Sequence, residues 1–191
     1  MDVKSFMKEN STERIPTRDE CEELMARYAM LPNIVEHSRQ VMRVSLAVAD
    51  HLKDGVSVNR DLVMAAALLH DITKTRSLKT KEKHAASGGA LLRELGFPSI
   101  AEIIEQHVVI QNLDPEGAIE EKEIVYYADK RVMHNTIVSL EERARDLLKR
   151  YGVTEEIRTQ ILRNWEQVKV VEQKIAGFLK TDIHNALQKI A

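Results

Sequence analysis

Residues that cross-link a chain or break its helices are scarce in this sequence of 191 residues. There are one cysteine, four prolines and seven glycines, and aromatic residues make up only 4%. The single cysteine, Cys21, excludes an intramolecular disulfide framework and fits a reducing compartment. Because Ala, Leu, Ile, Val and Met supply most of the apolar content and turn residues are few, the composition predicts an all-α fold.

Long apolar segments and a strong charge of one sign are also absent. No window approaches the ~18 consecutive apolar residues of a membrane span. The first ten residues, MDVKSFMKEN, lack the apolar core of a signal peptide. We therefore expect a cytoplasmic protein with no membrane contact. The formal net charge of −2 argues against an extended nucleic-acid-binding surface.

Helical periodicity and turn residues divide the chain into two parts. With 43% hydrophobic and 30% charged residues, it has the composition of an ordinary globular protein. We expect one domain over residues 18–140, and a helical extension over residues 141–191 that packs on the core or on a second subunit of a homodimer. No candidate catalytic or metal-binding residue is identified after Leu140. The expected helices cover residues 18–30, 34–52, 60–71, 84–95, 98–110, 120–138, 155–179 and 183–190.

The chain is organised around an apolar stretch, residues 62–69, that runs directly into His70 and Asp71. A helix that is apolar on all sides belongs in the middle of a fold. This one carries an imidazole and a carboxylate there, and burying such groups without partners costs roughly several kcal/mol. A divalent cation is one partner for them. A helix that ends in a solvated turn is the alternative.

Further ligand-type residues lie on apolar faces of other expected helices. They are His37, His84, His107 and Asp129. Any one histidine alone could be a satisfied core residue, but the full set with His70 and Asp71 is hard to explain as structure only. Imidazole and carboxylate together suit Fe, Mn, Zn, Co or Ni, and Mg less well. Six ligands are too many for one metal with open positions, whereas two ions about 3.5–4 Å apart, bridged by a carboxylate, fit the number.

Cationic residues lie close to these candidates in the sequence. Residues 72–83, expected to be a loop, carry five cations and one anion, and Lys74 is well placed there to contact a phosphate oxygen. Lys130 and Arg131 follow the candidate aspartate and are candidate substrate-binding residues, with plain surface charges as the alternative. His134 lies about 140° around the expected helix from that aspartate and is not a candidate ligand.

Taken in order, these residues resemble the HD-domain superfamily of metal-dependent phosphohydrolases. The family order His … His-Asp … Asp reads here as His37, His70-Asp71 in ALLHDITK, and Asp129 in YYADKRV. His84 and His107 match the two additional histidines of the dinuclear branch. The similarity covers about residues 34–135. HDITK has Thr73 where the HDIGK form of that branch has glycine, and the Gly-Tyr-Pro signature of the cyclic-di-GMP phosphodiesterases is absent.

The resemblance implies an HD-domain helical bundle, with a C-terminal helical extension, and a site for two divalent metal ions. His37, His70, Asp71 and Asp129 would hold one ion, and Asp71, His84 and His107 the other, with Asp71 bridging. Water activated by the two ions would attack the phosphorus of the substrate. Lys74 would stabilise the charge on the phosphoryl oxygens, so that Asp71 and Lys74 are the candidate catalytic residues.

Three functions stay open from the sequence. The main prediction is a metal-dependent phosphohydrolase that acts on a small phosphorylated substrate, with nucleotides among the candidates. A minority of HD-domain proteins resemble this one in their ligands but use a di-iron centre as oxygenases. The third is a non-catalytic ligand-binding protein on an HD fold, against which the intact set of six residues argues.

Overall fold

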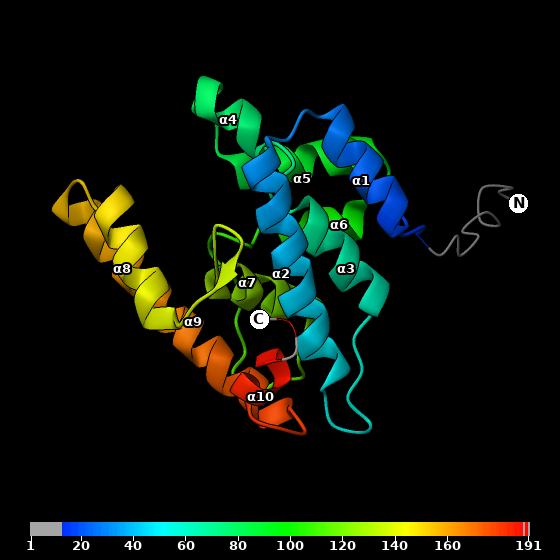
Figure 1. Cartoon of the computed structure of the whole chain (residues 1–191), viewed down its shortest axis with the longest axis vertical. Helices are drawn as coiled ribbons and strands as arrows, with labels where there is room; N and C mark the ends of the chain where they lie inside the picture. The colour runs from blue at the N-terminus through cyan, green and yellow to red at the C-terminus, as the bar shows by residue number, and fades with distance from the viewer. Residues whose placement is uncertain (1–12, 189, 191) are drawn as a thin grey trace, which may run out of the picture.

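The computed structural model describes residues 13–188 and residue 190, so the expectation for the first ten residues lies outside this range. The described chain is helical apart from a two-stranded hairpin (Figure 1), which confirms the all-α prediction. Among these residues, no helix combines the length and the apolar character needed to cross a bilayer. The elements are α1 (Arg18–Arg27), α2 (Pro32–Asp50), α3 (Arg60–Leu69), α4 (Lys74–Thr80), α5 (His84–Glu94), α6 (Pro98–Ile104), α7 (Glu121–Arg131), β1 (Val132–Met133), β2 (Thr136–Ile137), α8 (Leu140–Tyr151), α9 (Glu155–Phe178) and α10 (Ile183–Gln188).

Helices α2 and α3 pack against each other at the centre of the fold (Figure 1). One face of α2 is buried, whereas α3 is buried on almost every side, as its apolar sequence predicts. The side chain of Asn59 begins α3 by accepting a hydrogen bond from the backbone N–H of Leu62 (3.1 Å). The helix ends at Leu69, so His70 and Asp71 follow inside the core and not in a solvated turn.

Helices α1 and α6 pack against α3, and α5 packs against α6. A capping box begins α1, because Thr17 Oγ1 accepts from Glu20 N (3.3 Å) and Glu20 Oε2 accepts from Thr17 N (2.8 Å). Helix α5 can approach α6 closely because Gly88 has no side chain. A Cβ atom there would lie 3.1 Å from Ile104 Cδ1.

The expectation of a loop over residues 72–83 is wrong, because these residues contain the helix α4. The helix ends where Lys81 takes a left-handed backbone conformation (φ 62°). None of its residues is fully buried. It therefore has no apolar stripe from which helical periodicity could predict it.

The helix expected over residues 120–138 ends at Arg131, and an antiparallel hairpin follows it. His134 and Asn135 form the turn between β1 and β2, and His134 has a left-handed φ of 58°. Tight hairpin turns need positive φ, which Asn and His adopt more readily than most residues. The prediction failed because two-residue strands are too short to show a period of two. The hairpin brings β1 against α2.

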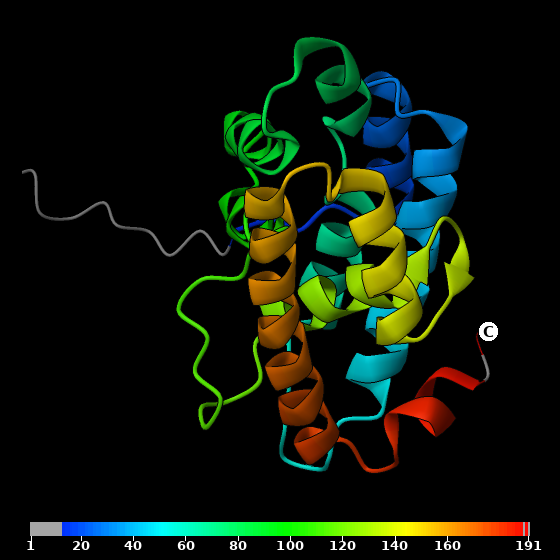
Figure 2. The same ribbon diagram turned by 90° about the vertical axis from the view of Figure 1, so that its left-hand side faces the viewer.

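Helices α8, α9 and α10 make up the C-terminal extension. Helix α9 packs on α7, and α10 packs on α2. The apolar seam of α9 is buried from Trp165 to Ile175, whereas Ile157 near its start is 39% exposed. The first half of α9 pairs with α8, side by side in Figure 2, and Figure 1 shows the two projecting beyond the rest of the bundle. We call this projecting part, residues 140–168, the arm.

A buried ion pair joins α9 to α7. Lys174 Nζ donates to Glu123 Oε1 (2.7 Å) and to the carbonyl oxygen of Asp114 (2.7 Å). The other carboxylate oxygen of Glu123 accepts from Glu120 N (3.0 Å). The side chains of the pair are only 2% and 1% exposed. Removing one partner would leave the other charge buried and uncompensated.

We expect Lys174→Met to lower the free energy of unfolding by about 3–5 kcal/mol, because it strands the Glu123 carboxylate. Lys169→Met is the matched control, since Lys169 lies on the exposed side of the same helix, where it pairs with the exposed Glu166. That change should cost less than about 1 kcal/mol. Denaturant unfolding followed by circular dichroism measures both. Adding Glu123→Gln to Lys174→Met should recover most of the loss, and equal losses in the two lysine variants would contradict the role of the pair.

Candidate metal centre

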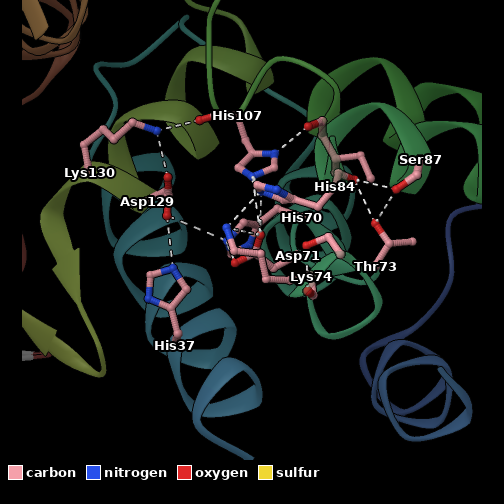
Figure 3. A network of polar contacts seen from close by, with 12 residues as sticks. His37, His70, Asp71, Thr73, Lys74, His84, Ser87, His107, Asp129 and Lys130 are labelled. Carbon is pink, nitrogen blue, oxygen red and sulfur yellow. Dashed lines mark hydrogen bonds and ion pairs between the residues drawn. The ribbon is translucent and has the colours of Figure 1, made fainter. Parts of the chain in front are cut away.

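Ligand-type side chains from five segments of the chain converge at one place in the bundle (Figure 3). The α2 and α7 helices supply one residue each, the end of α3 supplies two, and the start of α5 and the turn after α6 supply one each. They are His37, Asp129, His70, Asp71, His84 and His107. The structure thus brings together all six residues that the sequence singles out.

His107 reaches this cluster from a turn and not from a helix face. Helix α6 ends at Ile104, so the expected helical continuation to His107 is wrong. The backbone N–H of His107 donates to the Ile104 carbonyl (3.3 Å). This turn directs the imidazole inward, where the residue is only 2% exposed.

Asp129, His37 and His70 form one half of the cluster. Asp129 Oδ1 lies 3.0 Å from His37 Nε2 and 3.8 Å from His70 Nε2. His70 Nε2 lies 3.5 Å from Asp71 Oδ2. Metal–ligand bonds are about 2.0–2.2 Å for His and carboxylate ligands of Zn²⁺, so ligand atoms spaced in this way can surround one ion.

The other half is formed by Asp71 with His84 and His107. Asp71 Oδ1 lies 3.1 Å from His84 Nε2 and 3.5 Å from His107 Nε2. The two imidazole Nε2 atoms are 3.1 Å apart. Asp71 thus takes part in both halves, through Oδ2 in the first and Oδ1 in the second, as a bridging carboxylate would.

Backbone carbonyls fix which nitrogen of three of these imidazoles carries the proton. Nδ1 lies 2.8 Å from the Ala67 oxygen in His70, 2.5 Å from the Ile104 oxygen in His107, and 2.9 Å from the His134 oxygen in His37. A carbonyl oxygen can only accept, so Nδ1 is the donor in each case. In the neutral imidazole Nε2 then presents a lone pair, and all three Nε2 atoms point to the cluster centre.

Around His70 and Asp71 the cluster therefore holds acceptors that face acceptors. His70 Nε2 and Asp71 Oδ1 are fully buried and have no hydrogen-bond partner within the described part of the chain. Leaving buried polar atoms unpaired costs about 1–3 kcal/mol each, and more for a charge. Divalent cations would satisfy these atoms together, so the donor set fits the metal ions that the sequence predicts.

Electrostatics keep both carboxyl groups ionised. Burial raises the pKa of Asp71, but His70, His107, His84 and Lys74 together hold it well below its ordinary value. For Asp129 burial acts in the same direction, and Lys130 with His37 lowers the pKa well below the usual range. Burial lowers the pKa of His70 to about 4, so its imidazole is neutral at pH 7. Ionised carboxylates and a neutral imidazole are the forms that bind metals.

Lys74, the first residue of α4, stands at the edge of the cluster. Its Nζ atom lies 3.1 Å from His84 Nε2 and 3.7 Å from Asp71 Oδ1. The side chain is 31% exposed, so a bound molecule can reach its ammonium group. Thr73 supports the same region: its Oγ1 donates to the His84 carbonyl (2.8 Å) and accepts from Ser87 Oγ (3.0 Å). In the sequence Thr73 appears only as a departure from the usual glycine.

Lys130 and Arg131 are placed differently from each other. Lys130 Nζ donates to Asp129 Oδ2 (2.7 Å) and to the carbonyl of His107 (2.5 Å), so it braces one residue from each half of the cluster. The structure does not bring Arg131 to the cluster. Its Nε donates to the Val138 carbonyl (2.8 Å), and its guanidinium also contacts Tyr127. Arg131 thus ties α7 to the hairpin.

Sequence reasoning missed two other contributors. His134 takes part through its backbone, because its carbonyl orients His37, and no side-chain pattern can show this. The arm was expected to carry no functional residue. It forms one wall of a pocket of about 590 Å³ that begins at the cluster and has Arg143, Leu147, Ile161 and Trp165 along this wall.

A comparison with protein families covers the same part of the chain as the cluster. The HD-domain family model matches residues 34–134, more than half of the chain. This chain belongs to the HD-domain family. The match contains all six residues of the cluster, and the arm lies outside it.

Relatives of this HD-domain protein include two from Methanocaldococcus jannaschii. One is a dihydroneopterin 2′,3′-cyclic phosphate phosphodiesterase, 30% identical over 167 residues, which are 78% of this chain and 64% of that protein. The other is an uncharacterized protein, 30% identical over 134 residues, or 63% of this chain and 78% of that protein. A tRNA (cytidine(56)-2′-O)-methyltransferase of Picrophilus torridus is 29% identical over 143 residues, covering 67% of this chain but only 40% of its own. No solved structure matches.

Metal analysis of the purified protein tests the cluster. Purified without chelators or a metal-binding tag, the protein should contain about two divalent ions per chain. Asp71→Ala should contain almost none, because Asp71 belongs to both halves, and Asp129→Ala should lose one ion. Glu94→Ala, which removes an exposed carboxylate on α5, is the control and should keep both. Folded wild-type protein that takes up neither Mn nor Fe would contradict the assignment.

Proposed function

We propose that this protein is a metal-dependent phosphohydrolase that cleaves a small phosphodiester, with five-membered cyclic phosphodiesters as the first class to test. The observation that carries the proposal is the cluster of buried acceptors in which Asp71 faces both halves. The ions of a two-metal site lie about 3.5–4 Å apart, and a carboxylate shared by both ions fits that spacing. A purely structural cluster of this kind would be destabilising.

The residues of this chain would each have a defined part. His37, His70, Asp71 and Asp129 would hold one divalent ion, and Asp71, His84 and His107 the other. Ions bound there supply Lewis-acid activation of water and of the phosphoryl oxygens. The buried carboxylates stay ionised, and the three backbone carbonyls keep each Nε2 atom free to act as a ligand.

Two lysines near the cluster would have different roles, one in binding the substrate and one in positioning the ligands. Lys74, with its exposed ammonium group, would bind a phosphoryl oxygen and stabilise the negative charge that develops there. Lys130 is already bonded to Asp129 and to the His107 carbonyl, so we assign it to positioning the cluster and not to substrate binding. Arg131 is assigned to neither role, because it contacts the hairpin and Tyr127.

The phosphodiesterase relative supports hydrolysis over oxygen activation. A di-iron oxygenase would use the same six ligands, so the cluster alone does not separate the two reactions. The relative acts on a 2′,3′-cyclic phosphate by its name, and it aligns with 78% of this chain. Because the alignment spans less than two thirds of that protein, its substrate is taken here as a class of bond and not as a molecule.

Hydrolysis should be measured with a nucleoside 2′,3′-cyclic phosphate, bis(p-nitrophenyl) phosphate and p-nitrophenyl phosphate, after loading with Mn, Fe, Zn, Co or Ni. We expect cleavage of at least one diester and its loss in Asp71→Asn. Lys74→Met should lower kcat/KM by about 10²–10³-fold, as removal of a charge-stabilising donor does elsewhere. Lys79→Met, an exposed lysine of the same helix, should change it less than about twofold.

The same samples separate the alternatives. Two irons per chain with oxygen consumption on a reduced co-substrate, and no phosphate ester cleaved, would replace the hydrolase with the oxygenase. A fully metal-loaded protein that cleaves no ester and consumes no oxygen would favour a ligand-binding role. Equal activities of Lys74→Met and Lys79→Met would remove Lys74 from the mechanism while leaving the hydrolase in place.

A further inference from the structure

The pocket that begins at the cluster is larger than a phosphoryl group needs. Its volume of about 590 Å³ lies within the ~300–1,000 Å³ of pockets that enclose a whole small molecule. His37, His84 and Asp129 line it at one end, and residues of the arm line it at the other. The part of the pocket along the arm is therefore available for the portion of a substrate that carries no scissile bond.

The arm end is apolar on its walls. Leu147 of α8 and Ile161 and Trp165 of α9 line it, and Leu78 of α4 also lines the pocket. Leu78 is 53% exposed although it borders this space, so a bound group would cover it. Burying apolar side chains in this way favours a ligand group with apolar faces.

Polar groups at the same end exclude a simple alkyl chain as the preferred occupant. Arg143 of α8 and Asn164 of α9 line the pocket there. One nitrogen of the Arg143 guanidinium is paired with Asp146 (2.8 Å). Its Nε is buried and has no hydrogen-bond partner among the described residues. Because Arg143 lines the pocket, an acceptor on a ligand or a water molecule can pair with its guanidinium.

A flat heterocycle meets both requirements, because its faces are apolar and its edge carries nitrogen and oxygen acceptors. Arg guanidinium groups stack on and hydrogen-bond to such rings. We propose that the arm forms a subsite for the heterocyclic base of the substrate, with Ile161 and Leu147 packing on its face and Arg143 donating to its edge. This inference rests on the proposed function, since it places the scissile phosphodiester at the cluster.

Matched diesters and matched variants test the subsite by kinetics. The four nucleoside 2′,3′-cyclic phosphates carry a base, whereas ethylene phosphate has the same five-membered cyclic diester without one. Ile161→Ala should lower kcat/KM for the best nucleoside diester about tenfold and leave that for ethylene phosphate unchanged. Leu162→Ala is the control, because Leu162 is the next residue of α9 and its side chain is 52% exposed outside the pocket. Arg143→Gln is compared in the same way with Arg145→Gln, an exposed arginine of α8.

Binding gives a second measurement that needs no turnover. Trp165 is the only tryptophan of the chain and lines the pocket, so its fluorescence reports on the arm end. The four nucleoside 3′-monophosphates, as hydrolysis products, should quench it saturably, with at least one dissociation constant raised about tenfold by Ile161→Ala and not by Leu162→Ala. Inorganic phosphate should change it little.

The outcomes separate this proposal from the proposed function. Quenching that depends on Ile161, in a protein that hydrolyses no diester, would support the subsite and contradict the proposed hydrolase activity. Hydrolysis of base-bearing and base-free diesters with equal kcat/KM, unaffected by either pocket variant, would overturn the subsite and leave the hydrolase. No quenching by any of the four nucleotides, with no preference for base-bearing diesters, would also overturn the subsite.

Discussion

The structure depends on hydrogen-bond acceptors buried at the ligand cluster, two of which, His70 Nε2 and Asp71 Oδ1, have no hydrogen-bond partner among the described residues. Backbone carbonyls take the Nδ1–H protons of His70 and His107, and this leaves their Nε2 lone pairs facing Asp71. In a low-dielectric interior such an arrangement is unfavourable unless positive charge lies among the acceptors. The packing of the surrounding helices holds these atoms in place and offsets the unfavourable free energy of burying them.

The two halves of the chain have different tasks, and α7 connects them. One face of α7 carries Asp129 and Lys130 toward the cluster. Its other contacts hold the extension, through the Glu123–Lys174 ion pair and through Tyr127, whose hydroxyl bonds to Glu172. The ligand cluster and the C-terminal extension that lines the pocket are thus both attached to α7. A change in how the arm sits on α7 would alter which molecules fit without altering the ligand atoms.

Much of this arrangement could be predicted from the sequence, because it depends on long-period apolar patterns. The apolar run that ends at His70-Asp71 predicts the central helix. The histidines on apolar helix faces predict the cluster. The missed features leave no such pattern. Helix α4 buries no residue completely, the hairpin at His134 has strands of two residues, and His134 contributes only its carbonyl. The arm residues look like an ordinary amphipathic seam, since their position over the cluster is set by tertiary packing and not by local sequence.

The separation of the ligand residues along the chain has a consequence for the abundance of the protein in a cell. His37 and Asp129 are 92 positions apart, so an unfolded chain cannot present the set together. Ions that bind only the folded form would add stability, about 2.7 kcal/mol when free metal is a hundredfold above its dissociation constant. Scarcity of metal would then do more than lower activity. It would raise the unfolded fraction on which proteases act, and so couple the abundance of the protein to the metal supply.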